Sequence, residues 1–404
     1  MDNRMEQKKK ENILFVIDSL DCAGAEKSLV TLLSLLDYSK YSVDLLLFAH
    51  GNILEKLVPN KVNILSPLSY TKYSSLSINE AFLLSIKKAN FNMFYSRIKY
   101  SIAIRLQRLR NSQKARVYWE NVSKVIENNP KQYDIAISYA QGVPTFYVAE
   151  KVKAKKKFAW VNVSYRLGGK EKEFQKKYYD QYDKIVAVSD STKDIFLETF
   201  PEYVNKMDVI YDINNPKFIF EMSKIGDSYE DGFNGLRILT IGRLALQKGY
   251  DLALETCAIL KEKGINFRWY ALGKGPLEEE IKDKIVKYDL TENFKLLGVR
   301  ANPYPYIRDS DIYVQTSRFE GFGLAIAEAR MLNIPVVTTN FDAVFNQMKD
   351  GKNGLVVDME PNAISEGIIK LINDVKLKNN IIEYLKTEQK GNIEEIDKFY
   401  RLIG

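Results

Sequence analysis

The stretch from Ser317 to Ala329 carries the side chains most suggestive of chemistry. It follows a short apolar run, Ile312 to Val314, and contains Glu320, two glycines and Glu328. Glycines at the start of a small-residue helix let a ligand approach the backbone closely, and the free amides there can hold a phosphate. Either glutamate alone is typical of a helix surface or N-terminus. As a pair flanking the glycines, they indicate binding of the hydroxyl groups of one elongated ligand, such as a molecule that contains both a sugar and a ribose.

A second group of candidate residues runs from Gly242 to Gly249, directly after the apolar run Ile238 to Ile241. It contains Arg243 and Lys248, each next to a glycine. Arginine offers a fork of donors and lysine a point charge, so the two can clamp a diphosphate and stabilise charge on a phosphate leaving group. An Arg and a Lys in a loop are more often simply solvated, so this hypothesis depends on the two glutamates as well.

Short apolar runs alternate with helical stretches along the whole chain, which predicts the α/β class. The expected strands are 12–17, 43–48, 134–138, 157–161, 184–188, 236–241, 267–272, 295–298, 312–315, 335–339 and 354–357. We expect two Rossmann-like, doubly wound parallel-sheet domains, with the site at the carboxyl ends of the strands. The predicted domains are residues 1–214 and 215–385, and residues 386–404 are expected to pack back on the first domain as a helix. The polar segment 214–234 is the expected connection.

Length and charge agree with two domains of different character. The chain has 404 residues, 46% of them hydrophobic and 27% charged, and a net charge of +7. Residues 1–214 carry 33 Lys and Arg against 24 Asp and Glu, whereas the remainder carries 26 against 28. The first half therefore holds an excess of +9, which predicts an anionic partner or surface for that half alone.

Few residues are available for metal or redox chemistry. The chain has one histidine, His50, and two cysteines, Cys22 and Cys257, which argues against a histidine-rich metal centre, a disulfide framework and most Ser-His-Asp chemistry. The cysteines fit a reducing compartment. Lys8 to Lys10 precede an apolar run of only Ile13 to Ile17, too short for a signal peptide. We expect a cytoplasmic protein.

Residues 81–119 form a basic segment without Asp or Glu. Its cations are Lys87, Lys88, Arg97, Lys99, Arg105, Arg108, Arg110, Lys114 and Arg116. Apolar and aromatic residues interleave with them, so the segment either rests on an anionic membrane surface or is a solvated helical insertion packed on its own domain. The candidate membrane or acceptor contacts are Arg97, Lys99, Arg105 and Arg108. Nucleic acid is not expected, because no known nucleic-acid-binding fold accompanies the segment. Lys151 to Lys157 form another basic run, read as a solvated helix end.

These motifs together resemble the retaining glycosyltransferases of family 4, whose GT-B fold has two Rossmann-like domains facing a central cleft. The similarity covers most of the chain, and the Glu320 to Glu328 motif is its most specific part. The residues that carry it are Ala23-Gly24-Ala25-Glu26, Val188-Ser189, Val209-Ile210-Tyr211-Asp212, Gly242-Arg243, Lys248-Gly249, Gly273-Lys274-Gly275-Pro276, Leu297-Gly298, Asp311, Ser317 and 320–328.

The resemblance implies roles for residues at the matching positions. The donor-binding residues would be Gly24, Gly242, Arg243, Lys248, Gly298, Val299, Arg300, Glu320, Gly321, Phe322, Gly323, Leu324 and Glu328. Arg243 and Lys248 would stabilise the departing nucleotide diphosphate. Glu320 would contact the donor sugar, and these three would be the catalytic residues. Glu328 would bind the ribose, and residues 298–300 would border the base. The anomeric configuration would be retained, with no metal ion and no cofactor besides the nucleotide-sugar substrate.

Three features depart from the family pattern. Ala23 replaces the first glycine of a loop that often reads Gly-Gly-Ala-Glu, and Ser138-Tyr139 and Asn162 stand where many relatives have a histidine. Asp309-Ser310-Asp311 spells the metal-binding triplet of the other glycosyltransferase fold but leads into a strand. An isolated match of this kind carries little weight.

The expected function is therefore transfer of a hexosyl or N-acetylhexosaminyl group. The donor would be a nucleotide sugar, with a UDP-sugar favoured, and the acceptor a glycan or lipid-linked saccharide in surface polysaccharide or glycoconjugate biosynthesis. A peripheral position on the inner face of the cell membrane would follow. One alternative is a non-catalytic glycan- or protein-binding partner of an active transferase. A nicotinamide dehydrogenase would need a GxGxxG turn, which the loop around Gly24 does not supply.

Overall fold

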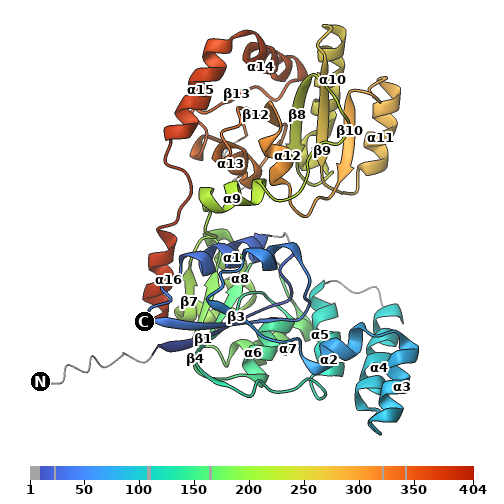
Figure 1. The fold of residues 1–404 in the computed structure, drawn as a ribbon, viewed down its shortest axis with the longest axis vertical. Helices are drawn as coiled ribbons and strands as arrows, with labels where there is room; N and C mark the ends of the chain where they lie inside the picture. Colours follow the sequence, from blue (N-terminus) through green and yellow to red (C-terminus); the bar gives the residue numbers. More distant parts are fainter. Residues whose placement is uncertain (1–9, 22–23, 107–110, 163–165, 321–322, 342–343) are drawn as a thin grey trace, which may run out of the picture. The chain divides into compact units, whose positions relative to one another are not determined.

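The computed structural model describes residues 10–21, 24–106, 111–162, 166–320, 323–341 and 344–404. The chain forms two compact units (Figure 1). Unit 1 comprises Met1–Asn214 with Asn392–Gly404, and unit 2 comprises Asn215–Gly391. The first boundary is the one expected from the sequence, whereas the chain returns to unit 1 at residue 392 rather than 386. No helix in the described ranges is both long enough and apolar enough to cross a membrane.

Unit 1 is built on a seven-stranded sheet with the order β3-β2-β1-β4-β5-β6-β7, and every described strand pair is parallel. Its strands are β1 (Glu11–Ile17), β2 (Tyr41–Leu47), β3 (Val62–Ile64), β4 (Gln132–Ser138), β5 (Lys153–Val161), β6 (Lys184–Ala187) and β7 (Met207–Val209). Its helices are α1 (Gly24–Leu35), η1 (Ile53–Leu57), α2 (Ser69–Ser75), α3 (Ile78–Lys87), α4 (Asn92–Leu106), α5 (Asn111–Val122), α6 (Val143–Lys151), α7 (Gly169–Tyr179), α8 (Asp190–Thr199), η2 (Pro201–Lys206) and α16 (Glu395–Ile403). The strand order reverses between β1 and β4, as in a doubly wound domain.

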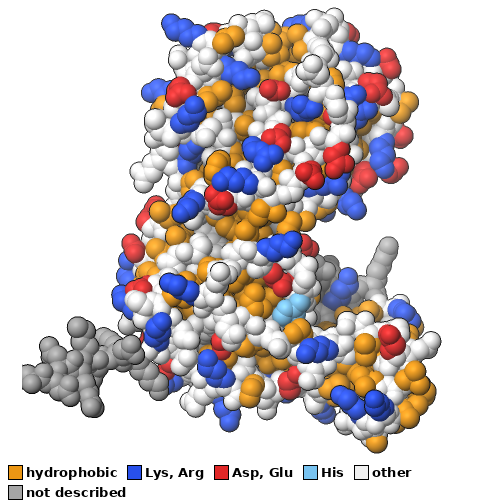
Figure 2. Space-filling model, viewed as in Figure 1, with side chains coloured by type: hydrophobic (Ala, Val, Ile, Leu, Met, Phe, Trp, Pro, Cys, Tyr) orange, Lys and Arg blue, Asp and Glu red, His pale blue; other side chains and the backbone are white. Residues whose placement is uncertain are grey.

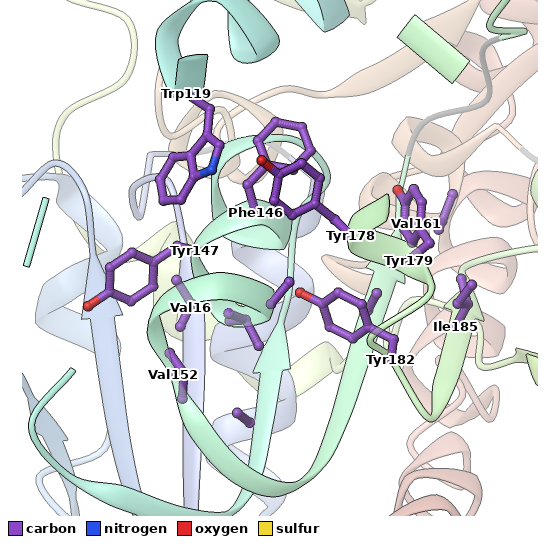
Figure 3. Close-up of a cluster of buried hydrophobic side chains, with 14 of the residues drawn as sticks. Val16, Trp119, Phe146, Tyr147, Val152, Val161, Tyr178, Tyr179, Tyr182 and Ile185 are labelled. Atoms are coloured by element: carbon purple, nitrogen blue, oxygen red, sulfur yellow. The ribbon is translucent and has the colours of Figure 1, made fainter. Parts of the chain in front are cut away.

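The core of unit 1 is unusually aromatic (Figure 3). The rings of Phe146 and Tyr178 lie with centroids 4.5 Å apart, and Trp119 meets Tyr147 edge to face. Buried tyrosine and tryptophan need partners for their polar atoms. Trp119 donates from Nε1 to Glu150, and Tyr182 donates its hydroxyl to the carbonyl of Thr145. The core thus ties helices α5, α6 and α7 to the sheet.

The last helix, α16, completes unit 1. Phe399 is fully buried, and its ring stacks on Phe15 of β1 and meets Trp160 of β5. The Tyr400 hydroxyl donates to the carbonyl of Leu35 and accepts from the backbone N–H of Asp37. The end of the chain is therefore part of the core of unit 1.

Unit 2 has a six-stranded parallel sheet with the order β10-β9-β8-β11-β12-β13. Its strands are β8 (Leu236–Ile241), β9 (Phe267–Leu272), β10 (Phe294–Gly298), β11 (Ile312–Gln315), β12 (Val336–Thr339) and β13 (Leu355–Val357). Its helices are α9 (Pro216–Ser223), η3 (Leu246–Lys248), α10 (Tyr250–Glu262), α11 (Glu278–Lys287), α12 (Tyr304–Arg308), α13 (Leu324–Met331), η4 (Val344–Asn346), α14 (Pro361–Asn373) and α15 (Val375–Thr387). This is the strand order of a Rossmann domain, with its reversal between β8 and β11.

The structure corrects three expectations. The short edge strands β3 and β7 were not predicted, and helix α9 lies in the segment 214–234 expected to be only a connection. Lys153 to Lys157 belong to strand β5 and not to a helix end. The lysine-rich start of β5 is largely exposed, whereas Phe158 to Val161 are buried. The polar half of the strand therefore resembled a solvated helix end.

Candidate active site

The residues predicted to do chemistry gather where the strand order of unit 2 reverses. Strands β8 and β11 are parallel neighbours, so both carboxyl ends lie at the same edge of the sheet. The loop after β8 carries Arg243 and Lys248, and the loop after β11 carries Glu320. Ligands of open α/β sheets bind at such a reversal, because the diverging loops leave a crevice there. The fold therefore brings together two motifs that are about 70 residues apart in the sequence.

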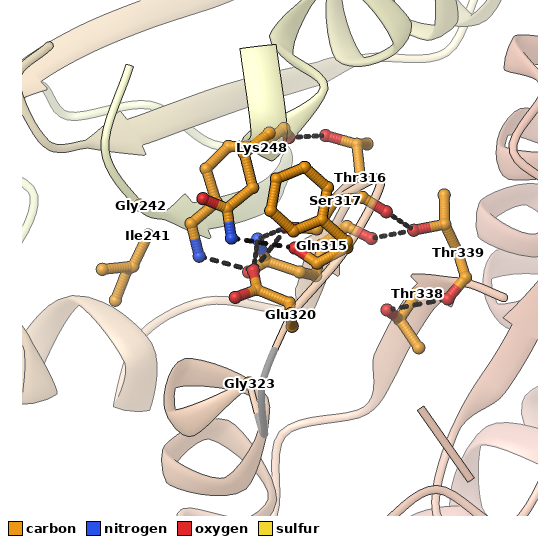
Figure 4. Close-up of polar contacts among 12 residues, drawn as sticks. Ile241, Gly242, Lys248, Gln315, Thr316, Ser317, Glu320, Gly323, Thr338 and Thr339 are labelled. Carbon is orange, nitrogen blue, oxygen red and sulfur yellow. Dashed lines mark hydrogen bonds and ion pairs between the residues drawn. The ribbon is translucent and has the colours of Figure 1, made fainter. Parts of the chain in front are cut away.

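Lys248 and Glu320 form an ion pair across these two loops (Figure 4). The Lys248 Nζ lies 2.5 Å from Glu320 Oε1, and the side chains are only 19% and 9% exposed. The Thr316 hydroxyl also donates to the carbonyl of Lys248 at 2.9 Å. The carboxylate and the ammonium are thus fixed beside each other before any ligand is bound.

A buried polar chain along β11 holds the Glu320 carboxylate in place. Ser317 Oγ donates to Glu320 Oε1 at 2.6 Å, and Gln315 Nε2 donates to Ser317 Oγ at 2.7 Å. The Tyr313 hydroxyl in turn donates to Gln315 Oε1 at 2.6 Å. Complete burial raises the pKa of Tyr313 well above its ordinary value, so this phenol stays a donor. A fully bonded buried chain is rigid, which favours a fixed position for the carboxylate.

Arg243 is positioned differently from Lys248. Its side chain is exposed, and no hydrogen bond or ion pair joins its guanidinium to another side chain within the described ranges. The preceding residue, Gly242, packs against the stem of Lys248, where an added Cβ would lie 3.1 Å from Cδ. Arg243 therefore directly follows the glycine against which the Lys248 stem packs, and the five N–H donors of its guanidinium are available to an anion.

Glycines let three neighbouring strand ends approach one another beside Arg243. The N–H of Gly273 donates to the carbonyl of Gly298 at 2.9 Å, and the N–H of Gly242 donates to the carbonyl of Leu272 at 3.0 Å. A Cβ on Gly273 would lie 2.0 Å from the carbonyl oxygen of Gly242. A side chain at position 273 would force the ends of β8 and β9 apart, so Gly273 keeps this edge compact.

Glu328 lies on α13, the helix that begins after Gly323. Gly323 has φ +81°, a left-handed conformation that favours glycine, and its carbonyl accepts from Gln347 Nε2 at 3.2 Å. The first N–H groups of a helix have no partner within it and suit an anionic ligand. Glu328 is half-buried and accepts from the Tyr304 hydroxyl at 2.7 Å. The carboxylate is therefore oriented by α12.

A second ion pair fixes the loop that carries Glu320. Arg318 binds Asp251 through two hydrogen bonds, at 2.8 and 2.6 Å, and its backbone N–H donates to the carbonyl of Gln247 at 2.8 Å. The hydrogen bonds from Arg318 lower the pKa of Asp251, so this carboxylate stays ionised. These contacts join residues 247–251 to the loop after β11, in addition to the Lys248–Glu320 pair.

The remaining candidate residues are less closely grouped. Val299, Arg300 and Leu324 are exposed, and the Arg300 guanidinium lies 5.8 Å from the centre of the Tyr306 ring. Gly24 begins α1 of unit 1 and is exposed. Gly321 and Phe322, predicted to bind the donor, fall outside the described residues.

Sequence reasoning missed the residues that hold the candidate groups. Tyr304, Gln315 and Asp251 lie on different elements from the carboxylates or cations that they position. Their spacing in the sequence gave no signal. Ser317 was named only as a residue that carries the family resemblance, although a serine three residues before a glutamate and close after a strand can bond to that glutamate.

The chain has recognisable relatives in sequence. Residues 232–388 match the family model of glycosyl transferases group 1. The capsular polysaccharide biosynthesis glycosyltransferase CapM of Staphylococcus aureus is 27% identical over 206 residues, which are 49% of this chain and 54% of CapM. A Campylobacter jejuni enzyme named N-acetylgalactosamine-N,N'-diacetylbacillosaminyl-diphospho-undecaprenol 4-alpha-N-acetylgalactosaminyltransferase is 26% identical over 215 residues, 53% of this chain and 57% of that enzyme. The chain thus spans little more than half the length of these two relatives.

The fold also has solved counterparts. Anabaena HepE, in a crystal structure with UDP and glucose, superposes with a TM-score of 0.59 and 17% identity, covering 97% of this chain and 98% of HepE. At this identity the likeness concerns the fold alone. Together with the two strand orders, it establishes the fold class expected from the sequence: two Rossmann-like domains of the GT-B type.

Proposed function

We propose that this protein is a retaining, metal-independent glycosyltransferase. It transfers a hexosyl or N-acetylhexosaminyl group from a nucleotide sugar, with a UDP-sugar favoured, to a glycan or lipid-linked saccharide. The observation that carries the proposal is the fixed Lys248–Glu320 pair at the strand reversal of unit 2, together with the exposed Arg243, whose guanidinium has no side-chain partner among the described residues. The match of residues 232–388 to glycosyl transferases group 1 supports it.

Each group has a part in the proposed reaction. Arg243 and Lys248 bind the diphosphate and stabilise the negative charge that grows on it as the bond to the sugar breaks. Glu320 accepts hydrogen bonds from sugar hydroxyls, and Glu328 accepts them from the ribose. The acceptor oxygen forms its bond to the anomeric carbon on the face that the diphosphate leaves, and the leaving phosphate oxygen takes the acceptor proton. The configuration at the anomeric carbon is therefore retained.

The names of the relatives guide the proposed pathway. CapM is named for capsular polysaccharide biosynthesis, and the Campylobacter enzyme is named for an undecaprenol diphosphate acceptor. HepE was crystallised with UDP and glucose. We accordingly propose surface polysaccharide or glycoconjugate biosynthesis as the role. The protein would act in the cytoplasm, at the inner face of the cell membrane.

A panel of nucleotide sugars tests the proposal. Slow hydrolysis should single out one donor, and that donor should then support transfer to lipid-linked saccharides with retention, read by NMR of the new anomeric centre. Activity should persist in EDTA. If calorimetry detects no affinity for any nucleotide diphosphate or nucleotide sugar, the protein is instead a non-catalytic binding partner. Inverted product or loss of activity in EDTA would contradict the proposed mechanism.

A further inference from the structure

Helices α3 and α4 of unit 1 expose a continuous apolar surface, here called the α3–α4 patch. The patch consists of Ile78, Phe82, Leu83, Ile86, Phe91, Tyr95, Ile102 and Leu106, all classed as exposed. Figure 2 shows hydrophobic side chains gathered over these helices, at the lower right. Leu83 is 64% exposed, Tyr95 67% and Leu106 78%. Contiguous exposed apolar surface of this kind marks an interaction site.

The patch is not the core-facing side of its helices. On α3, Ala81 and Ser85 point inward, and Ser85 Oγ lies 2.6 Å from the Tyr73 hydroxyl of α2. Ile78, Phe82 and Ile86 recur every four residues and therefore form a separate stripe beside that buried face. The Phe82 ring lies 6.3 Å from the ring of Phe91, the residue before α4, and 5.5 Å from the ring of Phe94 on α4, so these contacts join the two helices. The packing of unit 1 is thus complete without the patch.

Unpaired cations flank the patch. The side chains of Lys87, Lys88, Lys99 and Arg105 are exposed. None of these four side chains makes an ion pair or hydrogen bond within the described part of the chain. Residues 81–119 contain no Asp or Glu. The nearest acid, Glu80, caps α3 by accepting from the backbone N–H of Ser77 at 2.8 Å. Residues 78–106 therefore carry five cations against the single acid Glu80, a net charge of +4.

Two of the cations proposed from sequence do not join this set. Arg97 is half-buried, and its guanidinium donates to the carbonyls of Tyr73 and Leu76 at the end of α2. It holds α4 against α2 and has little left for a ligand. Arg108 lies outside the described residues.

We infer that the α3–α4 patch docks on the surface of a bilayer that contains anionic lipid. Its aliphatic and aromatic side chains enter the boundary of headgroups and acyl chains, and the four cations meet the lipid phosphates. The inference extends the proposed function, because a lipid-linked acceptor is presented at such a surface. Vesicle binding is nevertheless measured without donor or acceptor, so each can fail separately.

Other occupants fit the patch less well. A symmetric second copy would bring the same surface against itself and would oppose cations to cations. Single-stranded nucleic acid binds through stacking on aromatic side chains, whereas five of the eight patch residues are aliphatic and offer no ring. Charge and side-chain type together therefore favour the bilayer.

Co-sedimentation with vesicles tests the inference. Wild-type protein should bind vesicles of phosphatidylcholine with about 30% phosphatidylglycerol, and should bind them more weakly as salt is raised. The variant L83E/I86E should lose at least about tenfold in binding, since two exposed apolar anchors become acids. The variant K87Q/K88Q should lose on the order of 20-fold on these vesicles and little on pure phosphatidylcholine.

Matched controls come from unit 2. V286E/V375E makes the same change of charge at side chains that are 71% and 62% exposed, and K263Q/K376Q removes two exposed lysines. Both controls should bind as wild type. Absence of vesicle binding, equal losses in patch and control variants, or equal binding to neutral and anionic vesicles would overturn the inference. The inference would also be overturned if the wild type formed a dimer or bound an oligonucleotide but did not bind vesicles, and if L83E/I86E alone lost that dimer or complex.

Discussion

Lys248 and Glu320 meet at 2.5 Å from two loops that follow neighbouring strands, so each fixes the position of the other. Removing only one partner leaves a nearly buried charge uncompensated. We expect Lys248→Met to lower the free energy of unfolding by about 1–3 kcal/mol. The double variant K248M/E320Q should be less destabilised than K248M alone, because Gln315 and Ser317 still bond to the new amide. Urea titration of the wild type, K248M, E320Q and K248M/E320Q measures the coupling energy between the two side chains. Strictly additive losses of unfolding free energy would contradict the ion pair.

Arg243 offers the complementary case, since its guanidinium is exposed and has no side-chain partner within the described ranges. Arg243→Ala should change the free energy of unfolding by less than about 0.5 kcal/mol. Transfer should nevertheless fall by about 100- to 1,000-fold, because charge on the leaving diphosphate loses its stabiliser. Arg243→Lys should recover part of the loss. Unchanged turnover in Arg243→Ala would remove this residue from the proposed site.

Tyr304 donates to Glu328 at 2.7 Å and orients the carboxylate proposed to bind the ribose. Tyr304→Phe deletes only that hydroxyl, so calorimetry should register roughly 3- to 10-fold weaker binding of the nucleotide diphosphate. Tyr288→Phe, at the end of α11, is the matched control and should bind as wild type. A Tyr304→Phe protein with full affinity would mean that Glu328 has another role.

Gly249 allows the loop after β8 to approach the end of β11. Its φ is +62°, and an added Cβ would lie 2.0 Å from the carbonyl oxygen of Thr316. Gly264 has a similar φ of +73° but open space around it. Gly264→Ala should therefore cost only the strain of a left-handed alanine, about 1–2 kcal/mol.

Gly249→Ala should cost more than Gly264→Ala and should also reduce transfer, because Thr316 directly precedes the serine that holds Glu320. Thermal unfolding and initial rates, measured on both variants, separate the two effects. Equal stabilities would show that the backbone contact at Thr316 is not tight.

The sequence predicted three central strands of unit 2 with their full bounds but missed both edge strands of unit 1. The strands Leu236–Ile241, Phe267–Leu272 and Ile312–Gln315 were predicted to the residue, because apolar side chains predominate in each of them. The edge strands Val62–Ile64 and Met207–Val209 are three residues long and half-exposed, so no run marks them. Helix α9 was missed because it begins at Pro216, directly after two asparagines, which is typical of a turn or loop.

The candidate site was predictable only where chemistry and backbone demands coincide in one motif. Gly323 and Gly249 adopt positive φ, and the cations and carboxylates stand beside them in the sequence. The pairing of Lys248 with Glu320 depends on which strands are neighbours, and this is a property of the sheet. Tyr304 and Asp251, which bond to Glu328 and Arg318, lie on separate elements, so no local sequence pattern indicates them. Long-range order of this kind does not follow from spacing.

Asp231 provides a test at low pH within unit 2. Its carboxylate accepts hydrogen bonds from the Tyr270 hydroxyl, the backbone N–H of Phe233 and the Arg268 guanidinium. Partial burial raises its pKa, but these three donors outweigh it and bring the pKa from the ordinary 3.8 down to about 2. The ionised group therefore stabilises the folded state above pH 3.8, and that stabilisation is lost as the pH falls towards 2.

The urea midpoint of the wild type should consequently fall between pH 5 and pH 2 by more than that of Asp231→Asn, which cannot titrate at this position, in a window set by a carboxyl pKa of about 4 in the unfolded chain. Because other carboxylates titrate in the same range, the difference between the two proteins isolates the contribution of Asp231. Asp283→Asn, at an exposed residue of α11, should follow the wild-type curve. Parallel curves for wild type and Asp231→Asn would mean that the three donors do not favour the ionised carboxylate.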